Sequence, residues 1–206
     1  MAGAWGLAPP RPGKPVRSDR QAPSVEICLV GIGAKLMPEP PGDGLVCGLI
    51  MAGLAGALDP VLRVGDVVID DCPTAALPAV AYRRGKICAS PTLLSTPADK
   101  QAMFDRTRAL AVDMESAAAR QLAADWSVPF VSIRAISDAA DESLDPAVLK
   151  LVDSFGRPRP LCIAATLVQR PSLIPHLRRL GAASSLAADH LAKAVRGIAQ
   201  AWSEID

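Results

Sequence analysis

Aromatic side chains and histidines are scarce in this chain of 206 residues. Half of the residues are apolar, but only 3% are aromatic, so the core must be built from aliphatic side chains. Nothing in the sequence offers the row of stacking aromatics that RNA-binding modules use. The only two histidines, His176 and His190, lie in the C-terminal third. A histidine-based metal centre is therefore not expected, and we predict chemistry without a metal.

An excess of charge and a pairing pattern of cysteines are missing too. The formal net charge is +1, which provides no basic field for nucleic acid. The cysteines occur singly and form no CxxC pair, a pattern typical of reduced thiols in a cytoplasmic chain. They are Cys28, Cys47, Cys72, Cys88 and Cys162. Disulfide frameworks and zinc sites are therefore not expected.

Long hydrophobic runs do not occur. No apolar run reaches the roughly 18 to 20 residues that span a bilayer. The first residues contain Pro9, Pro10 and Pro12 and have no signal-peptide core. We therefore expect a soluble, cytoplasmic protein, with contact to the surface of the inner membrane as the one membrane role left open.

Alternating strand and helix signals predict an α/β fold. Residues 1–24 are rich in Pro, Gly and Arg and are expected to form a disordered tail, followed by one domain over 25–206. The predicted strands are 25–30, 44–51, 64–69, 87–90 and 128–136, and the predicted helices are 99–110 and 114–126. From Asp145 onward the chain is expected to be helical, with an apolar stripe from Leu177 to Trp202 that is interrupted near Gly181.

Two glycine pairs are candidates for binding an anion or a nucleophilic water. Gly31-Ile-Gly33 follows the first predicted strand, and Gly53-Leu-Ala-Gly56 follows the second. Glycine loops at such places can present backbone N–H groups, although glycine pairs also occur in ordinary turns. Leu36 occupies the last position of a GxGxxG pattern, so a dinucleotide site is not supported.

Glu115 is the first candidate for binding a sugar. In the first turn of the predicted helix 114–126, with Asp113 as N-cap, the helix dipole would keep this carboxylate ionised. An ionised carboxylate accepts hydrogen bonds from both hydroxyls of a vicinal diol such as ribose, and Met114 beside it offers a soft apolar face. The structural alternative is an ordinary first-turn acid next to a core methionine.

Asp138 is the candidate acid. It ends an apolar strand, where burial favours a protonated carboxyl that can donate to N7 of a departing purine. Arg134 lies four residues earlier, so residues 134, 136 and 138 are expected to share one face of the strand. The alternatives are that Asp138 caps the next helix and that Arg134 forms a structural ion pair, for example with Glu115.

Three segments resemble one enzyme family. Ala111-Val-Asp-Met-Glu-Ser116, Arg134-Ala-Ile-Ser-Asp138 and Gly53-Leu-Ala-Gly56 with Val64-Gly-Asp-Val-Val68 are similar to signature stretches of the purine nucleoside phosphorylase and uridine phosphorylase superfamily. The methylthioadenosine/S-adenosylhomocysteine nucleosidase branch is the most similar, and the likeness covers about residues 44–140. It implies a three-layer α/β/α fold with a central mixed sheet, and a homo-oligomer. It implies no cofactor, with inorganic phosphate as an optional co-substrate.

The resemblance also implies a role for each matched residue. Met114 would pack under the ribose, Glu115 would bind its 2′- and 3′-hydroxyls, and Arg134 would organise the acidic pair. Asp138, oriented by Ser137, would protonate or hydrogen-bond N7 of an adenine. Residues 89–94 would form a wall beside the base, with Leu93 where the family often has a stacking Phe.

The chain departs from the family on the side of the nucleophile. Too few residues precede Gly44 for the family's first β-unit, and Glu26 and Glu39 are poor substitutes for its water-activating acid. Leu54 stands near the place of a Ser or Thr that contacts phosphate or water. Two functions therefore stay open: an enzyme that cleaves the N-glycosidic bond of an adenine nucleoside, and a nucleoside-binding relative that has lost catalysis.

The C-terminal part resembles a particular subgroup. Residues 153–158, 169–175 and 177–180 are similar to the tail of hopanoid-associated phosphorylases. This resemblance implies a lipid-linked substrate, adenosylhopane, from which adenine would be removed to leave ribosylhopane in hopanoid biosynthesis. Arg178, Arg179, Lys193 and Arg196 accompany the apolar stripe of the last helix, which suggests contact with a membrane surface. The alternative is that this helix packs on the domain or on a partner subunit.

Overall fold

The computed structural model describes residues 11, 16–17, 25–39, 46–71 and 81–203. Most of the predicted tail 1–24 lies outside the described residues. β1 (Val16–Arg17) belongs to this tail and pairs antiparallel with β2 (Glu26–Ile27), which follows it in the sequence. The strand predicted over 25–30 is thus limited to two residues, and the chain beyond it turns at Gly31.

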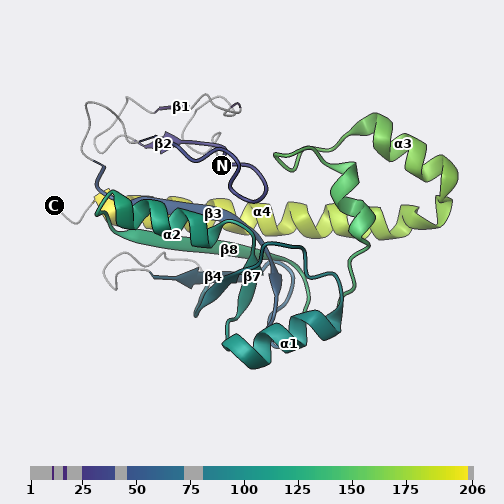
Figure 1. The fold of residues 1–206 in the computed structure, drawn as a ribbon, viewed down its shortest axis with the longest axis horizontal. Coiled ribbons are helices and arrows are strands. Elements are labelled where there is room, and N and C mark those ends of the chain that lie inside the picture. Colours follow the sequence, from purple (N-terminus) through teal and green to yellow (C-terminus); the bar gives the residue numbers. More distant parts are fainter. Residues whose placement is uncertain (1–10, 12–15, 18–24, 40–45, 72–80, 204–206) are drawn as a thin grey trace.

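The centre of the fold is a mixed sheet of six strands (Figure 1). The strands are β3 (Leu49–Ala57), β4 (Val67–Asp70), β5 (Arg83–Arg84), β6 (Ile87–Ala89), β7 (Ala111–Asp113) and β8 (Phe130–Asp138). Their order is β5-β4-β8-β3-β7-β6. β8 runs parallel to β3 and antiparallel to β4, which confirms the predicted mixed sheet.

β8 is a central strand with one apolar face, whereas its other face carries Ser132 and Arg134. Val131, Ile133 and Ala135 are completely buried, and they pack against one side of α4 (Ile174–Ser203). On α4 the contacting residues are Ala187, Leu191, Ala194, Val195 and Ile198. Each aliphatic side chain of the size of Val or Ile buried in this way contributes about 1.5–3 kcal/mol to folding. The strand predicted over 128–136 is therefore confirmed, and it extends to Asp138.

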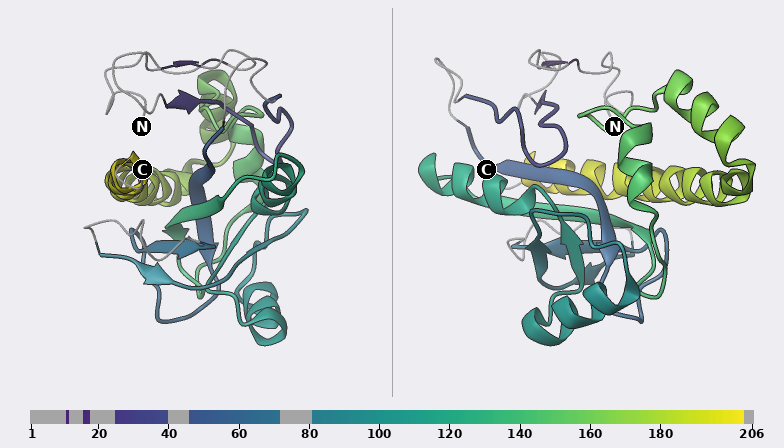
Figure 2. Two further views of the ribbon diagram at one scale, coloured as in Figure 1. Left: turned by 90° about the vertical axis from the view of Figure 1, so that its left-hand side faces the viewer. Right: turned by 45° about the vertical axis from the view of Figure 1, so that its right-hand side comes forward.

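Helices cover both faces of the sheet, as the three-layer architecture requires. α2 (Ser116–Asp125) places Ala119 and Ala123 against Met51 and Phe130. α4 covers the opposite face, and Figure 2 shows the two helices on either side of β3. α1 (Pro97–Thr107) begins with Thr96, whose hydroxyl accepts from the Asp99 N–H at 3.1 Å, and it packs at the lower edge of the sheet.

The predicted glycine loop over 53–56 is wrong, because these residues lie inside β3. Gly53 is paired with Arg134 and Gly56 with Asp138 on β8. A Cβ at Gly53 would overlap the guanidinium of Arg134, and one at Gly56 would lie 2.9 Å from a carboxylate oxygen of Asp138. The glycines therefore make room for two charged side chains of the neighbouring strand.

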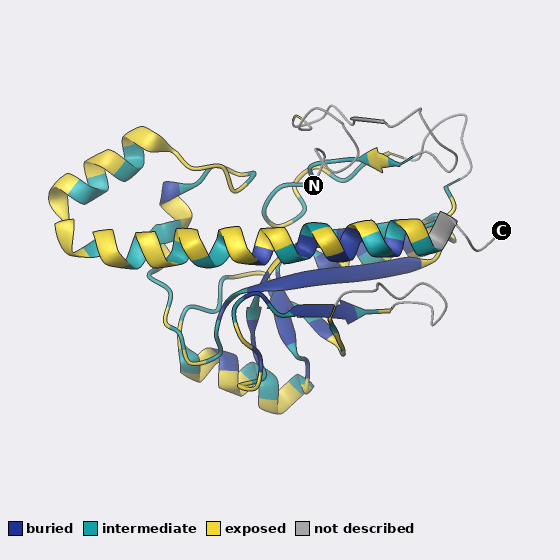
Figure 3. Cartoon of the chain, turned by 180° about the vertical axis from the view of Figure 1, so that it is seen from behind, coloured by how far each residue is buried: buried dark blue, intermediate teal, exposed yellow. Residues whose placement is uncertain are grey.

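The C-terminal part is helical, as predicted. It contains η3 (Pro146–Leu151), α3 (Pro160–Gln169), η4 (Pro171–Leu173) and α4. α4 continues through Gly181, where the apolar stripe is predicted to be interrupted, since a glycine inside a helix costs only about 1 kcal/mol relative to alanine. The first half of α4 and all of α3 project beyond the sheet (Figure 3). Among the described residues no helix is both long and apolar enough to cross a membrane.

Candidate functional site

A bulge in β8 sets the position of Asp138. Ala55 is opposite Ile136, but the next residue of β3, Gly56, is opposite Asp138, so Ser137 is an extra residue in β8. The Ser137 hydroxyl lies 2.8 Å from Asp138 Oδ1 and 3.3 Å from the Ala55 carbonyl oxygen. Ser137 therefore contacts the carboxylate that it is predicted to orient.

The same bulge overturns the expectation that residues 134, 136 and 138 share a face. One extra residue breaks the two-residue alternation of a strand. As a result, Asp138 and Arg134 have separate partners: Asp138 contacts α1, and Arg134 contacts the end of β7 and the residues after it.

Lys100 of α1 is the main partner of Asp138. Its side chain is 1% exposed, and Nζ donates to Asp138 Oδ2 at 2.7 Å. Nζ also donates to the carbonyl oxygens of Ala139 at 2.7 Å and Glu142 at 3.1 Å. Three acceptors match the three hydrogens of an ammonium group. The buried carboxylate is thus charge-compensated, and the segment after β8 is tied to α1.

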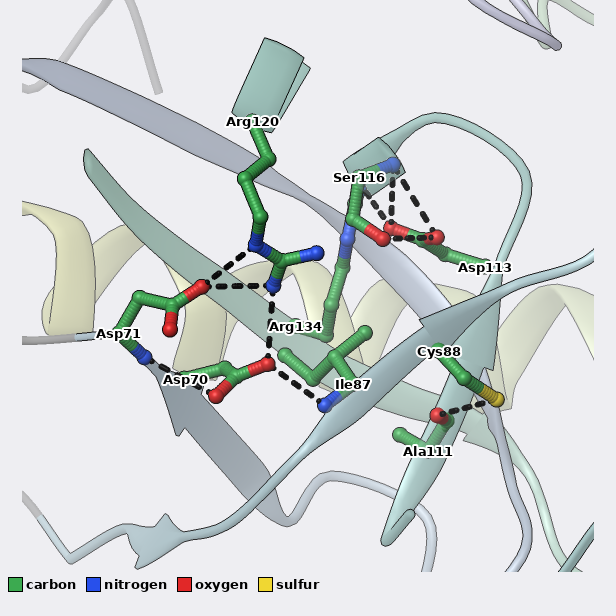
Figure 4. A network of polar contacts seen from close by, with 9 residues as sticks. All are labelled: Asp70, Asp71, Ile87, Cys88, Ala111, Asp113, Ser116, Arg120 and Arg134. Atoms are coloured by element: carbon green, nitrogen blue, oxygen red, sulfur yellow. Dashed lines mark hydrogen bonds and ion pairs between the residues drawn. The ribbon is translucent and has the colours of Figure 1, made fainter. Parts of the chain in front are cut away.

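A second charged cluster surrounds Arg134, which is 2% exposed. Its NH2 group lies 2.5 Å from Asp113 Oδ2 and 3.7 Å from Glu115 Oε2. Asp113 also accepts from the Ser116 N–H at 3.2 Å and the Ser116 hydroxyl at 2.7 Å (Figure 4). The prediction of Asp113 as N-cap is therefore wrong, because Glu115 occupies that position. Asp113 instead contacts Ser116, the first residue of α2, and forms an ion pair with Arg134.

Glu115 lies two positions before the one predicted for it, because α2 begins at Ser116 and not at Met114. It occupies the N-cap of α2 rather than the first turn, and its side chain does not cap the helix. Instead its Oε1 accepts the Gly33 N–H at 2.8 Å. Gly31 and Gly33 have φ angles of 75° and 72°, a conformation that favours glycine, so the turn brings Gly33 to the carboxylate. The anion that this turn binds is thus the Glu115 carboxylate of the protein itself.

A small pocket lies between the two charged clusters. Asp138 and Lys100 line one part of it, and Asp113 and Met114 line another. The remaining lining residues are Gly56, Thr92, Leu93, Leu94 and Val112. Part of the predicted base wall over 89–94 is therefore present. The nine described lining residues include no aromatic side chain, as Leu93 in place of Phe implied.

Six of the predicted residues surround this pocket or support it. Leu93, Met114 and Asp138 line it, Ser137 contacts Asp138, and Arg134 and Glu115 form the neighbouring cluster. Gly33 contacts this cluster through its hydrogen bond to Glu115, and Gly31 belongs to the same turn as Gly33. Gly53 lies inside β3 and is not part of a loop. Leu54, also in β3, is 36% exposed.

Two residues of the site were not predicted for it. Lys100 lies in a polar, charged stretch of α1, and the sequence of this stretch does not indicate a binding or catalytic site. Asp113 was predicted only as a helix cap, although an acid that ends a buried strand, Ala111–Asp113, is a signal that sequence reading can use.

A further ion cluster supports the sheet below the site (Figure 4). Arg120 of α2 lies 3.1 Å from Asp70 and 2.6 Å from Asp71, and Asp70 accepts the Ile87 N–H at 2.9 Å. Burial raises the pKa of the Asp70 carboxyl above its ordinary value, against the hydrogen bond from Ile87 and the charge of Arg120, which lower it. This cluster joins β4, β6 and α2 and does not line the pocket.

Comparison with known proteins supports the fold independently. The family model described as Phosphorylase superfamily matches residues 72–157, a range that contains Lys100, Asp113, Glu115, Arg134 and Asp138. Among solved structures, the futalosine hydrolase of Helicobacter pylori superposes with a TM-score of 0.50 at 17% identity. That alignment covers 75% of this chain and 68% of the other.

Two nucleosidases give similar values. The Helicobacter pylori 5′-methylthioadenosine/S-adenosylhomocysteine nucleosidase, complexed with a substituted pyrrolidin-3-ol, has a TM-score of 0.51 at 17% identity, with 75% of this chain and 68% of that chain covered. The corresponding enzyme of Colwellia psychrerythraea, in complex with adenine, has a TM-score of 0.50 at 19% identity, with 76% and 68% covered. The chain therefore has the fold of these nucleosidases.

Proposed function

We propose that this chain is an enzyme that cleaves the N-glycosidic bond of an adenine nucleoside. The main observation is the pocket itself, which has the buried pair Asp138–Lys100 on one part of its wall and Met114, next to Glu115, on another. A nucleoside needs these two environments at once, a polar group for the base and an apolar face with a carboxylate for the ribose. The superfamily match and the nucleosidase fold support the same reading.

On the side of the leaving group, Asp138 hydrogen-bonds to N7 of the purine. As the bond between N9 and the anomeric carbon lengthens, the sugar becomes an oxocarbenium ion and negative charge grows on the base. Transfer of the proton from the Asp138 carboxyl to N7 neutralises that charge, and Lys100 compensates the carboxylate that is left. Such acid catalysis contributes about 10²- to 10⁴-fold to the rate. Ser137 and Lys100 hold the two oxygens of the carboxylate in place.

On the side of the sugar, Glu115 binds the 2′- and 3′-hydroxyls and Met114 packs under the ring. Arg134 lies close to both Asp113 and Glu115, so one cation compensates two carboxylates. This compensation allows Glu115 and Asp113 to lie close together, and Glu115 is placed to accept hydrogen bonds from two hydroxyls.

The nucleophile is water or inorganic phosphate, which attacks the anomeric carbon from the face opposite to the base. Leu54 replaces the hydroxyl expected to contact phosphate or water, and we favour water because a phosphate, with more oxygens to bind, depends more on such contacts. No cofactor is proposed.

Release of adenine tests this proposal. The protein is incubated with adenosine and with 5′-methylthioadenosine, with and without phosphate, and adenine is quantified by chromatography. Asp138→Asn is expected to lower the rate by about 10²-fold or more, since it removes the acid. Asp105→Asn, an exposed acid of α1, serves as the matched control. Absence of adenine in both conditions would refute the proposal, and full activity of Asp138→Asn would exclude Asp138 as the acid.

A catalytically inactive, nucleoside-binding relative is the second candidate. The departure at Leu54 favours it, because it affects the delivery of the nucleophile and leaves the base and ribose sides intact. Titration calorimetry with adenine separates the two candidates. Binding of adenine together with no turnover of either nucleoside identifies a binding protein.

For the substrate, we favour a lipid-linked adenine nucleoside of the adenosylhopane type, and for the assembly a homo-oligomer. The support is the resemblance of residues 153–158 and 169–180 to hopanoid-associated phosphorylases. A kcat/KM for adenosylhopane in detergent micelles well above that for adenosine would support this choice. Equal values would refute it without affecting the reaction type.

A further inference from the structure

One continuous segment of the chain is strongly basic. Residues 154–188, called the arm below, contain five arginines and no acidic residue. The remainder of the chain has 17 basic and 21 acidic residues, so the net charge of +1 conceals two regions of opposite sign. The arginines are Arg157, Arg159, Arg170, Arg178 and Arg179.

The arm also exposes an apolar helix. α3 (Pro160–Gln169) carries no charged residue, and none of its residues is buried. Leu161 is 86% exposed and Val168 is 85% exposed. Because they are seven residues apart, with Ala164 and Ala165 between them, they form one stripe along the helix. Apolar side chains exposed to this degree on a helix without charges indicate a surface that binds a partner.

The arm lies beside the candidate site. It projects beyond the sheet, where Figure 3 shows α3 and the first half of α4 largely exposed. At its base, Arg179 forms an ion pair with the Glu142 carboxylate at 3.4 Å. The carbonyl oxygen of the same Glu142 accepts from Lys100, the partner of Asp138. Any surface on which the arm docks would therefore lie close to the pocket.

We infer that the arm docks on the surface of an anionic lipid membrane. The stripe of α3 enters the boundary between headgroups and acyl chains, and the arginines at both ends of α3 and at the start of α4 contact lipid phosphates. A lipid surface satisfies both properties at once. A phosphate backbone of nucleic acid would leave the apolar stripe in water, and a second copy related by a two-fold axis would bring five arginines against five.

This assignment differs from the membrane contact suggested by the sequence. The stripe of the last helix from Ala187 to Ile198 packs on the sheet and is not available to lipid. Lys193 and Arg196 lie on that packed half, so of the four cations noted in the sequence only Arg178 and Arg179 belong to the arm.

Co-sedimentation of the full chain with vesicles tests the inference. One set of vesicles is pure phosphatidylcholine, and the other contains equal parts of phosphatidylcholine and phosphatidylglycerol. We expect binding to the anionic vesicles only, and weaker binding as salt is added. The triple variant Arg159→Gln, Arg170→Gln, Arg178→Gln is expected to bind on the order of 100-fold more weakly, at roughly fivefold per arginine. Leu161→Ser with Val168→Ser is also expected to lose binding.

The control is Lys35→Gln, Arg63→Gln, Lys193→Gln, which removes the same charge from exposed positions outside the arm. This control should bind as the wild type does. Equal loss in the control, or no sedimentation of the wild type, would overturn the inference. So would a wild-type dimer in analytical ultracentrifugation that Leu161→Ser with Val168→Ser converts to a monomer, since a second copy would then cover the stripe. The assay involves no turnover, so its outcome is separate from that of the proposed reaction.

Discussion

Lys100 links the candidate acid to the rest of the molecule. All three of its hydrogen bonds are made inside the protein, and its side chain is 1% exposed. A lysine held in this way cannot turn toward water, so the carboxylate of Asp138 has a fixed orientation toward the pocket. At the scale of single residues, the site therefore consists of a carboxylate and the cation that positions it.

A double-mutant cycle tests this positioning role. Lys100→Met is expected to lower kcat for adenine release by about 10-fold or more, and to change KM little, because it acts on the orientation of Asp138. In the Asp138→Asn background the same substitution should change the residual kcat by less than about threefold.

Stability must be followed in the same variants. Removing one partner of a buried ion pair costs about 3–5 kcal/mol, so Lys100→Met is expected to unfold at lower temperature, and Lys100→Met with Asp138→Asn at an intermediate one. Equal factors on kcat in both backgrounds would mean that Lys100 only stabilises the fold.

Sequence reading identified the residues that lie within contiguous motifs. Met114, Ser137 and Asp138 were predicted near one another because two short segments carry them, and the structure places them around one pocket. Lys100 is 38 residues before Asp138. Its pairing depends on how α1 approaches the end of β8, and no local pattern encodes that approach.

At the scale of elements, the glycines of β3 show how composition can mislead. Two glycines within four residues usually indicate a loop, because glycine weakens a strand. In β3 they are retained inside the strand, where the neighbouring β8 carries Arg134 and Asp138. The reason lies in the side chains of another element, which a reading of residues 53–56 alone does not include.

Two glycine-to-alanine substitutions are expected to have opposite effects. Gly53→Ala displaces Arg134 from Asp113 and Glu115, so we expect destabilisation by about 3–5 kcal/mol. Gly181→Ala, in the interior of α4 with no atom within 4 Å of the added Cβ, is expected to stabilise the protein. The gain should be about 0.5–1 kcal/mol. Chemical denaturation measures both, and a neutral Gly53→Ala would contradict the close approach of Arg134.

At the scale of the whole molecule, stability is distributed unevenly. The sheet and the second half of α4 share the largest buried cluster, whereas no residue of α3 is buried. The α/β class and part of the order of the elements along the chain followed from periodicity, but β5 and β7 were not predicted as strands. The order of strands in the sheet, and the projection of the arm, depend on long-range contacts that periodicity does not report.

Hydrogen exchange should reveal this distribution. Amides of β3 and β8 are expected to exchange most slowly, and those of α3 at least about 100-fold faster than those of α2. The comparison is well matched, because both helices have 10 residues, but α2 buries three of them and α3 none. Mass spectrometry of peptides measures the difference, and equal protection of the two helices would show that α3 is covered in solution.

The hydrogen bond from Gly33 to Glu115 has a consequence for the proposed ribose site. The carboxylate proposed to bind the ribose accepts a backbone N–H at 2.8 Å. Each carboxylate oxygen can accept more than one hydrogen bond, so a ribose hydroxyl would share Oε1 with this donor and would meet a carboxylate whose orientation is already set. The turn at Gly31–Gly33 thereby belongs to the proposed site without touching the ligand, and it joins segments that are 82 residues apart in the sequence.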